Sequence, residues 1–115
     1  MKILLVFTGG TIGSSIINGY ISPDNTKSYK LLELYNNIQS SFIDEKVDFD
    51  IIKPFTILSE NINCKGISQL VKVIKENINQ DYDGIIVCHG TDTVMYSASA
   101  LSYAFGGNSI PIMIA

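Results

Sequence analysis

The sequence predicts an α/β fold with a mainly parallel sheet in three layers, of the flavodoxin-like kind. Short apolar segments alternate along the chain with longer segments of helical period, and glycine or polar residues separate them. Strands that alternate with helices favour a parallel sheet with helices on both faces. The chain has 115 residues, of which 46% are hydrophobic and 17% are charged. This length and composition are typical of one globular domain.

A strand and a hairpin are the first elements that we expect. Lys2–Phe7 is a short apolar run, and a glycine-rich loop follows it. Further on, Asn18 and Gly19 stand between apolar residues. This dipeptide is a strong hairpin signal, because both central residues of a type I′ turn need positive φ. A β-hairpin is therefore predicted after the first strand.

The middle of the chain predicts two helices with a strand between them. Apolar residues at helical spacing predict an amphipathic helix over Tyr29–Ile43. A second apolar stripe, from Ile67 to Ile78, predicts another helix. Between the two, Val47–Ile52 alternates apolar and acidic residues, which is the pattern of a half-buried strand.

The last part of the chain predicts strand, helix and strand. Gly84–Cys88 is a short apolar run, and Val94–Phe105 has small and apolar residues on most sides, as expected of a helix packed closely against a sheet. We expect the glycines of 106–108 to end this helix, because glycine relaxes the left-handed cap geometry. Ile110–Ala115 is a further apolar strand.

Charge and cysteine content argue against several classes of function. The net charge is -3 and there is no basic run, so nucleic acid is not an expected partner. Cys64, Cys88 and the single histidine do not have zinc-site spacing, so no metal is expected. No apolar run approaches the roughly 20 residues that span a bilayer, and the first run is too short for a secretory signal. We expect no membrane association and a reducing, cytoplasmic location.

Two threonine-bearing glycine loops stand out. Residues 8–13, Thr-Gly-Gly-Thr-Ile-Gly, follow the first strand, and residues 89–93, His-Gly-Thr-Asp-Thr, follow the strand at 84–88. Both loops lie where an open α/β sheet binds its ligand, beyond the carboxyl ends of strands. One loop offers an alcohol nucleophile, and the other a carboxylate beside a second alcohol. The pair suggests covalent acyl chemistry, with backbone N–H groups available to an oxyanion.

Each residue of these loops also has a simpler interpretation. Thr11 could belong only to a tight turn, and phosphate binding lacks both the lysine of GxxxxGK[ST] and the first glycine of GxGxxG, where Thr8 stands. Asp92 or Thr93 could cap the helix that follows. The functional alternative is that Asp92 binds a substrate ammonium while Thr91 orients water or acts as an alcohol.

The remaining candidates have similar alternatives. His89 could be a general base, or it could form a hydrogen bond to backbone at the end of its strand. Tyr20 lies on the expected hairpin, where its hydroxyl could enter the site as part of a lid, or the ring could simply pack. Ser59 and Glu60 read by themselves as residues of a polar turn.

Four segments together resemble the bacterial-type L-asparaginase family, and the lack of a secretory signal resembles its cytoplasmic, type I branch. The segments are 8–13, then 19–23 (Gly-Tyr-Ile-Ser-Pro), then 59–61 (Ser-Glu-Asn), then 89–93. The resemblance runs from residue 1 to residue 115. It implies hydrolysis of L-asparagine, with L-glutamine as an alternative substrate, to the acid and ammonia, without a cofactor or a metal.

The resemblance also implies roles for individual residues. Thr11 resembles the nucleophile that forms an acyl-enzyme, Tyr20 the lid tyrosine that positions or activates it, and Thr91 the second catalytic threonine. Asp92 resembles the carboxylate that works beside Thr91 and contacts the substrate α-amino group. Backbone at Gly10 belongs to the same glycine-rich turn, which supplies hydrogen-bond donors.

The third segment resembles the substrate-binding pair of the family. Ser59 then takes the α-carboxylate and Glu60 the α-amino group. Family members carry either Gln or Glu at this position, and we hypothesise that Glu60 weakens the use of glutamine. Comparable turnover of asparagine and glutamine would contradict that hypothesis.

One part of the family pattern lies outside residues 1–115. The lysine that pairs with the Asp92 position comes further along the chain in the family, as does a C-terminal domain, and a neighbouring subunit completes each site. The expectation is therefore an incomplete, N-terminal asparaginase-like domain with impaired activity, which forms homo-oligomers through the apolar strand at 110–115. The alternatives are a non-catalytic amino-acid-binding or assembly module and a related amidohydrolase, such as a subunit of a tRNA-dependent amidotransferase.

Overall fold

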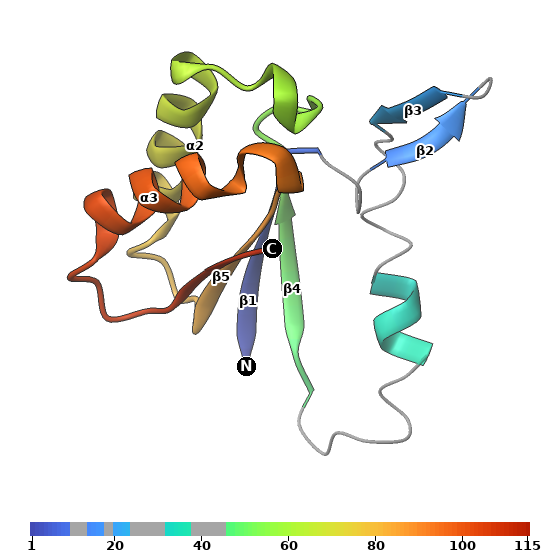
Figure 1. Ribbon diagram of the computed structural model, residues 1–115. Coiled ribbons are helices and arrows are strands. Elements are labelled where there is room, and N and C mark those ends of the chain that lie inside the picture. Colours follow the sequence, from blue (N-terminus) through green and yellow to red (C-terminus); the bar gives the residue numbers. More distant parts are fainter. Residues whose placement is uncertain (10–13, 18–19, 24–31, 38–45) are drawn as a thin grey trace.

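The computed structural model describes residues 1–9, 14–17, 20–23, 32–37 and 46–115, and for 14–17 and 20–23 it describes the backbone alone. Within these ranges four parallel strands form one sheet in the order β4-β1-β5-β6 (Figure 1). The strands are β1 (Lys2–Phe7), β4 (Asp48–Ile52), β5 (Gly84–Cys88) and β6 (Ile112–Ile114).

The topology is the flavodoxin-like one that the sequence predicts. The chain runs from β1 outward to β4 on one side, then crosses back to β5 and β6 on the other. The strand order therefore reverses between β1 and β5. In open α/β sheets this switch point opens a crevice at the carboxyl ends of the strands. The loops after β1 and β5, at 8–13 and 89–93, begin on either side of it.

The predicted hairpin is present as a separate two-stranded sheet. β2 (Ser14–Ile17) and β3 (Tyr20–Pro23) pair in antiparallel fashion, with Ile17 opposite Tyr20. The turn residues Asn18 and Gly19 lie outside the described residues. Of the helix predicted over Tyr29–Ile43, the described part, residues 32–37, is helical.

The larger core lies between the sheet and helices α2 (Cys64–Asn77) and α3 (Val94–Phe105). Asn63 caps α2: its side-chain oxygen accepts hydrogen bonds from the N–H groups of Lys65 and Gly66, both at 3.1 Å. The apolar stripe of α2 then faces the sheet. The fully buried aliphatic residues of this core each contribute about 1.5–3 kcal/mol of burial free energy; they are Leu4, Val6, Leu70, Ile74, Ile85 and Val87.

The opposite face of the sheet has a smaller core of Leu5, Phe7 and Cys88. The helix at 32–37 covers part of this face, and the ring of Tyr35 packs edge-on against Phe49 with ring centroids 5.0 Å apart. The sheet therefore has helices on both faces, as expected. None of the helices in the described ranges is long and apolar enough to cross a membrane.

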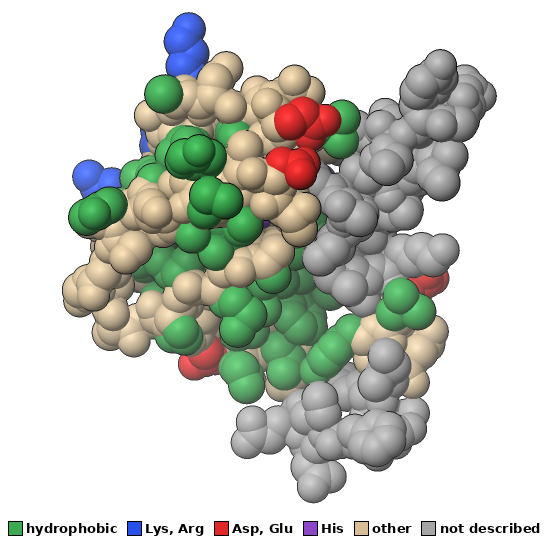
Figure 2. Space-filling view, viewed as in Figure 1, with side chains coloured by type: hydrophobic (Ala, Val, Ile, Leu, Met, Phe, Trp, Pro, Cys, Tyr) green, Lys and Arg blue, Asp and Glu red, His purple; other side chains and the backbone are tan. Residues whose placement is uncertain are grey.

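α3 differs from its prediction in two respects. It buries only one side, and Met95, Tyr96 and Tyr103 are exposed. An apolar groove of about 300 Å³ separates it from β6, and hydrophobic surface continues from α3 toward the sheet (Figure 2). The helix does end at Phe105, but Gly106 has φ −60° and ψ −11°, so the predicted left-handed cap is wrong. A right-handed turn continues there, and the reason for glycine is steric instead, because a Cβ on Gly106 would lie 2.7 Å from the carbonyl oxygen of Ser102.

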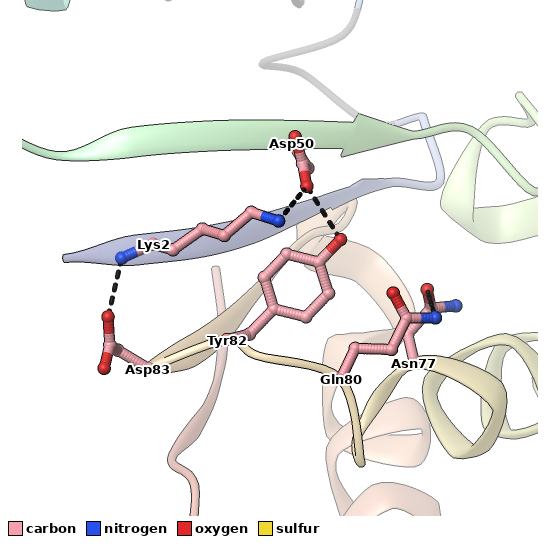
Figure 3. Close-up of polar contacts among 6 residues, drawn as sticks. All are labelled: Lys2, Asp50, Asn77, Gln80, Tyr82 and Asp83. Atoms are coloured by element: carbon pink, nitrogen blue, oxygen red, sulfur yellow. Dashed lines mark hydrogen bonds and ion pairs between the residues drawn. The ribbon is translucent and has the colours of Figure 1, made fainter.

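A polar cluster joins three segments near the start of β1 (Figure 3). The Lys2 ammonium lies 3.0 Å from Asp50 Oδ2, and the Tyr82 hydroxyl donates to the same oxygen at 2.9 Å. The backbone N–H of Lys2 donates to Asp83 Oδ2 at 2.6 Å. The hydrogen bond from Lys2 lowers the pKa of Asp50, and the same bond raises the pKa of Lys2. Burial, followed by the bond to Asp50, raises the pKa of Tyr82.

Candidate functional site

The first glycine loop begins at a tightly anchored residue, Thr8. Thr8 is buried, and both its N–H and its hydroxyl donate to the carbonyl of Cys88, at 3.1 and 3.0 Å. Its own carbonyl accepts the N–H of Ile57 at 3.1 Å. The chain leaving β1 is therefore held between the end of β5 and the segment that follows β4.

Gly9 meets a steric requirement at this point. Its φ is +116°, a conformation that side chains disfavour, and a Cβ placed on it would overlap the carbonyl oxygen of Ile57. Only glycine fits where these two backbones pair. The sequence suggested that backbone N–H groups of this loop are available to an oxyanion, whereas the contact described at Gly9 is with the backbone of Ile57.

The structure does not describe the functional groups of three predicted site residues. Thr11 and Gly10 lie outside the described residues, and Tyr20 is described only as backbone in β3. Their roles as nucleophile, donor loop and lid remain predictions.

The structure brings together Ser59 and Asp92, which the sequence places in separate motifs. Ser59 begins the 3-10 turn η1 (Ser59–Asn61), and Asp92 lies in the 3-10 turn η2 (Thr91–Thr93). The two turns lie side by side beyond the carboxyl ends of the strands (Figure 1). The Ser59 hydroxyl donates to Asp92 Oδ2 at 3.2 Å. Ser59 is 5% exposed whereas Asp92 is exposed, so the pair runs from the protein interior to the surface.

Thr93 makes the second bond between these turns. Its hydroxyl donates to the backbone carbonyl of Ser59 at 2.8 Å. Thr93 occupies the N-cap position of α3, but its side chain makes no capping hydrogen bond. The interpretation of Thr93 as a helix cap is therefore wrong, and the acceptor that Asp92 offers is used by Ser59. Sequence analysis did not identify this contact, because a threonine before a helix is the usual pattern of a cap.

His89 is held from both sides. It is 4% exposed, with Nδ1 2.7 Å from the Gly90 carbonyl oxygen and Nε2 2.9 Å from the hydroxyl of Ser97. A carbonyl can only accept, so Nδ1 carries a proton, and in the neutral imidazole Nε2 then accepts from the Ser97 hydroxyl. The hydrogen bond to backbone that we considered for His89 is confirmed. Both ring nitrogens are engaged, which does not favour its role as a general base.

The surface around these turns is acidic. Glu60 in η1 and Thr91 in η2 are both exposed, as is Asp92. Acidic side chains gather at this end of the molecule in Figure 2. Within the described ranges, no group of three or more His, Cys, Asp and Glu residues is placed to hold a metal ion.

These groups suit a small zwitterion. Carboxylates attract an ammonium, and a hydroxyl such as that of Ser59 can donate to a carboxylate. The lysines of α2 do not supply a buried positive charge beside these turns, because all three are exposed; they are Lys65, Lys72 and Lys75. The described part of the candidate site therefore offers groups that can pair with an ammonium and with a carboxylate.

Comparisons with known proteins agree with the observed fold. The model of the family "Asparaginase, N-terminal" matches residues 2–115. The L-asparaginase of Thermococcus kodakarensis has a similar structure, with a TM-score of 0.77 and 28% identity over 99% of this chain and 33% of that one. L-asparaginase I of Vibrio cholerae has a TM-score of 0.68 and 28% identity over 89% of this chain and 29% of that one.

Curated relatives carry a different name, that of a glutamyl-tRNA(Gln) amidotransferase subunit. The one from Methanosarcina barkeri is 36% identical over 98% of this chain and 26% of its own length. The one from Methanosarcina acetivorans is 39% identical over 89% of this chain and 23% of its own length. The chain thus spans about a quarter of the curated relatives that it matches. With the family model covering residues 2–115, the chain belongs to the asparaginase family, to whose N-terminal domain it is similar throughout.

Proposed function

We propose that this chain carries the amino-acid-binding half and the nucleophile of an amidohydrolase that converts L-asparagine to L-aspartate and ammonia. The observation that supports this most is the Ser59–Asp92 pair, a hydroxyl and a carboxylate brought 3.2 Å apart from turns at the carboxyl ends of the strands. Family membership supports the reaction class.

In the proposed reaction, the Thr11 hydroxyl attacks the side-chain amide carbon of L-asparagine. The hydroxyl proton passes to the leaving nitrogen, the C–N bond breaks and ammonia departs, which leaves an ester between Thr11 and the aspartyl group. Water then attacks the ester, releases L-aspartate and restores the Thr11 hydroxyl. Thr91 and Asp92 assist proton transfer, and Tyr20 closes over the nucleophile.

Recognition of the head group is assigned to the two turns. Ser59 donates to the α-carboxylate, and Glu60 and Asp92 hold the α-ammonium. The Ser59 hydroxyl that donates to Asp92 must rotate toward the incoming carboxylate, while the ammonium takes over as the partner of Asp92. Backbone N–H groups near Gly10 complete the donors. No cofactor is needed for these steps.

The test is ammonia release from L-asparagine by this chain, beside Thr11→Ala. Ammonia release that Thr11→Ala abolishes supports the proposal. Release that Thr11→Ala leaves intact contradicts the nucleophile assignment. A parallel titration with L-aspartate, followed by thermal unfolding, tests the binding half separately, and Ser99→Ala on the exposed side of α3 serves as a variant outside the site.

A second candidate follows from the curated relatives. Those at 36% and 39% identity are named as a glutamyl-tRNA(Gln) amidotransferase subunit. In that case ammonia release would serve transfer to an aminoacyl-tRNA, and the RNA would be bound by other parts of the complex, because this chain has a net charge of -3. Ammonia release that requires glutamyl-tRNA(Gln) would favour this candidate, and release without RNA would favour the first.

We further propose a cytoplasmic homo-oligomer. Both cysteines, Cys64 and Cys88, are free, as in a reducing compartment. β6 forms the outer strand of the described sheet, and its residue Met113 is 61% exposed. Such an edge invites pairing with another chain. Small-angle scattering at high concentration should show self-association, which Met113→Lys should reduce; a monodisperse monomer would contradict the proposal.

A further inference from the structure

We propose that Thr93 is a positioning residue that holds the Ser59–Asn61 turn against the Thr91–Thr93 turn, and so sets the distance between Ser59 and Asp92. Its consequence for ligand binding rests on the proposed function. The linkage itself is a property of the fold.

The two turns are joined by hydrogen bonds in opposite directions. η2 donates to η1 through the Thr93 hydroxyl, which lies 2.8 Å from the Ser59 carbonyl oxygen. η1 donates to η2 through the Ser59 hydroxyl, which lies 3.2 Å from Asp92 Oδ2. Ser59 takes part in both bonds, as acceptor through its carbonyl and as donor through its hydroxyl. Separation of the two turns would therefore lengthen both bonds together.

The Ser59 carbonyl also stabilises its own turn. It accepts the N–H of Ile62 at 3.0 Å, so its oxygen receives one bond from within the segment after β4 and one from Thr93 in η2. The N–H of Asn61 donates to the Leu58 carbonyl at 3.0 Å in the same turn. The Thr93 bond is therefore made to a fixed acceptor, and it ties η2 to a turn that is already closed.

Burial makes the link effective. Ser59 is 5% exposed, and Thr93 is half-buried between the two turns. Water competes less for hydrogen bonds in such a position. Thr93 also gives up the role usual for its place in the chain: with φ −126° and ψ 13° it precedes α3 but does not bond to the first N–H groups of the helix. Its hydroxyl acts between the turns.

The consequence for the site is a preorganised pair of head-group contacts. Ser59 and Asp92 are 33 residues apart in the chain and come from segments on opposite sides of β1. Each must be within hydrogen-bond reach of one small ligand at the same time. A residue that fixes both turns before the ligand arrives reduces the ordering cost of binding.

Three variants separate this role from simple packing. Thr93→Val keeps the shape and removes the hydroxyl, and Thr93→Ser keeps the hydroxyl and removes the methyl group. Ser99→Ala is the matched control, because the Ser99 hydroxyl donates to the Met95 carbonyl at the same distance, 2.8 Å, but within α3. All three are made in the 115-residue chain.

The first readout is amide hydrogen exchange, which needs no ligand. We expect Thr93→Val to speed exchange at the N–H groups of Asn61 and Ile62, while Thr93→Ser and Ser99→Ala stay close to the unsubstituted chain. Exchange in Thr93→Val that matches Ser99→Ala would overturn the proposal. Failure of Thr93→Ser to preserve the slow exchange would overturn it too, because the methyl group would then be the important part.

The second readout is binding of L-aspartate. Loss of one hydrogen bond that orders the turns should weaken binding about threefold to tenfold in Thr93→Val. If the chain turns over L-asparagine, we expect KM to rise, because head-group contacts are made equally in the ground and transition states. We expect kcat to fall as well, because Thr91 and Asp92 lie in the loosened turn. A fall in kcat at constant KM would overturn the positioning role.

The two proposals fail in different ways. A chain that neither binds L-aspartate nor releases ammonia, but shows faster exchange in Thr93→Val, contradicts the proposed function and supports the link. A chain that binds L-aspartate equally well with and without the Thr93 hydroxyl supports the proposed function and contradicts the link.

Discussion

The hydroxyl of Ser97 and the Nε2 atom of His89 lie 2.9 Å apart, and both side chains are almost completely buried. Because Nδ1 of His89 donates to the Gly90 carbonyl, Nε2 of the neutral imidazole has the Ser97 hydroxyl as its donor. Ser97→Ala should leave this buried acceptor without a partner. We expect a loss of about 1–3 kcal/mol in the free energy of unfolding, measured by urea titration.

Ser99→Ala is the control for this substitution. It removes the same atom two residues along α3, where the hydroxyl is exposed and bonds the helix backbone. Alanine has the highest helix propensity, so the expected change is within about 0.5 kcal/mol of zero. Equal losses for the two serines would show that His89 does not depend on Ser97.

Gly9→Ala should destabilise the start of the first loop. The substituted residue would have to keep φ at +116° and would overlap the carbonyl oxygen of Ile57. Strain of this kind costs about 1–3 kcal/mol, and displacement of the paired backbone adds to it. Urea unfolding is the measurement.

Gly107→Ala is the matched variant, since a Cβ there meets nothing within 4 Å. It should leave the free energy of unfolding nearly unchanged. If Gly9→Ala were equally harmless, the backbone pairing between Gly9 and Ile57 could not be important for the fold.

The Asp50 cluster predicts how stability responds to acid. The pKa of Asp50 is lowered in the folded chain, chiefly by the hydrogen bond from Lys2. The stabilisation that ionised Asp50 gives to the folded state is therefore fully present above its pKa in the unfolded chain, about 3.9. It is lost as the pH falls through the lower pKa of the folded chain. As the pH is lowered below about 4, we expect the urea concentration at the unfolding midpoint to decrease, and to decrease less steeply in Asp50→Asn.

Asp48→Asn provides the comparison on the same strand. It removes the same charge, but its ion pair with Lys46 is 3.7 Å long and its side chain is 68% exposed. Exposed pairs of this kind contribute little. The acid slope in Asp48→Asn should resemble that of the unsubstituted chain, and a slope like that of Asp50→Asn would rule out a special role for the Lys2 pair.

The same cluster responds to alkali in the opposite direction. The pKa values of Lys2 and Tyr82 are both raised in the folded chain. The stabilisation that the protonated side chains give to the folded state is therefore present at neutral pH, and it is lost as the pH rises through these raised pKa values, above about pH 10. Tyr82→Phe should cost about 0.5–1.5 kcal/mol at pH 7 by removing the hydroxyl bond to Asp50. It should also reduce the alkaline loss, which a urea series from pH 7 to about pH 11 would measure.

The two thiols should differ sharply in reactivity. Burial raises the pKa of Cys88 to about 11, whereas Cys64 is exposed at the start of α2. At about pH 8 a disulfide reagent should react quickly with one thiol in the folded chain and with two in denaturant. Cys64→Ser should remove the fast reaction. Rapid labelling of folded Cys64→Ser would indicate that β5 opens readily.

The elements of this fold were predictable because their patterns are local. Gly84–Cys88 and Val94–Phe105 are a strand and a helix with the expected bounds, and Val47–Ile52 differs by one residue. A run of apolar residues or a helical stripe depends on neighbours within a few positions. The flavodoxin-like order followed, because alternation of such elements leaves few topologies.

The contacts of the candidate site were less predictable. The sequence identified Ser59 and Asp92 as candidates, but the bond between Thr93 and Ser59 joins residues 34 positions apart. Nothing near Thr93 in the sequence distinguishes that bond from a helix cap. Ser97 similarly reads as one of several small residues of α3, and only the fold brings it to His89.

The placement of β1 between the strands that precede Ser59 and Asp92 has a thermodynamic consequence. Ser59 follows β4 and Asp92 follows β5, so their meeting requires three strands to be paired in register. A ligand that needs both residues can bind only molecules in which these three strands are paired, and it stabilises that state by about 2.7 kcal/mol at one hundred times its Kd. Substitutions in β1 that lower the fraction of molecules with these strands paired, including substitutions at its far end, would then weaken the apparent affinity in proportion to that fraction. In this fold, the apparent affinity for such a ligand therefore also depends on the fraction of folded molecules.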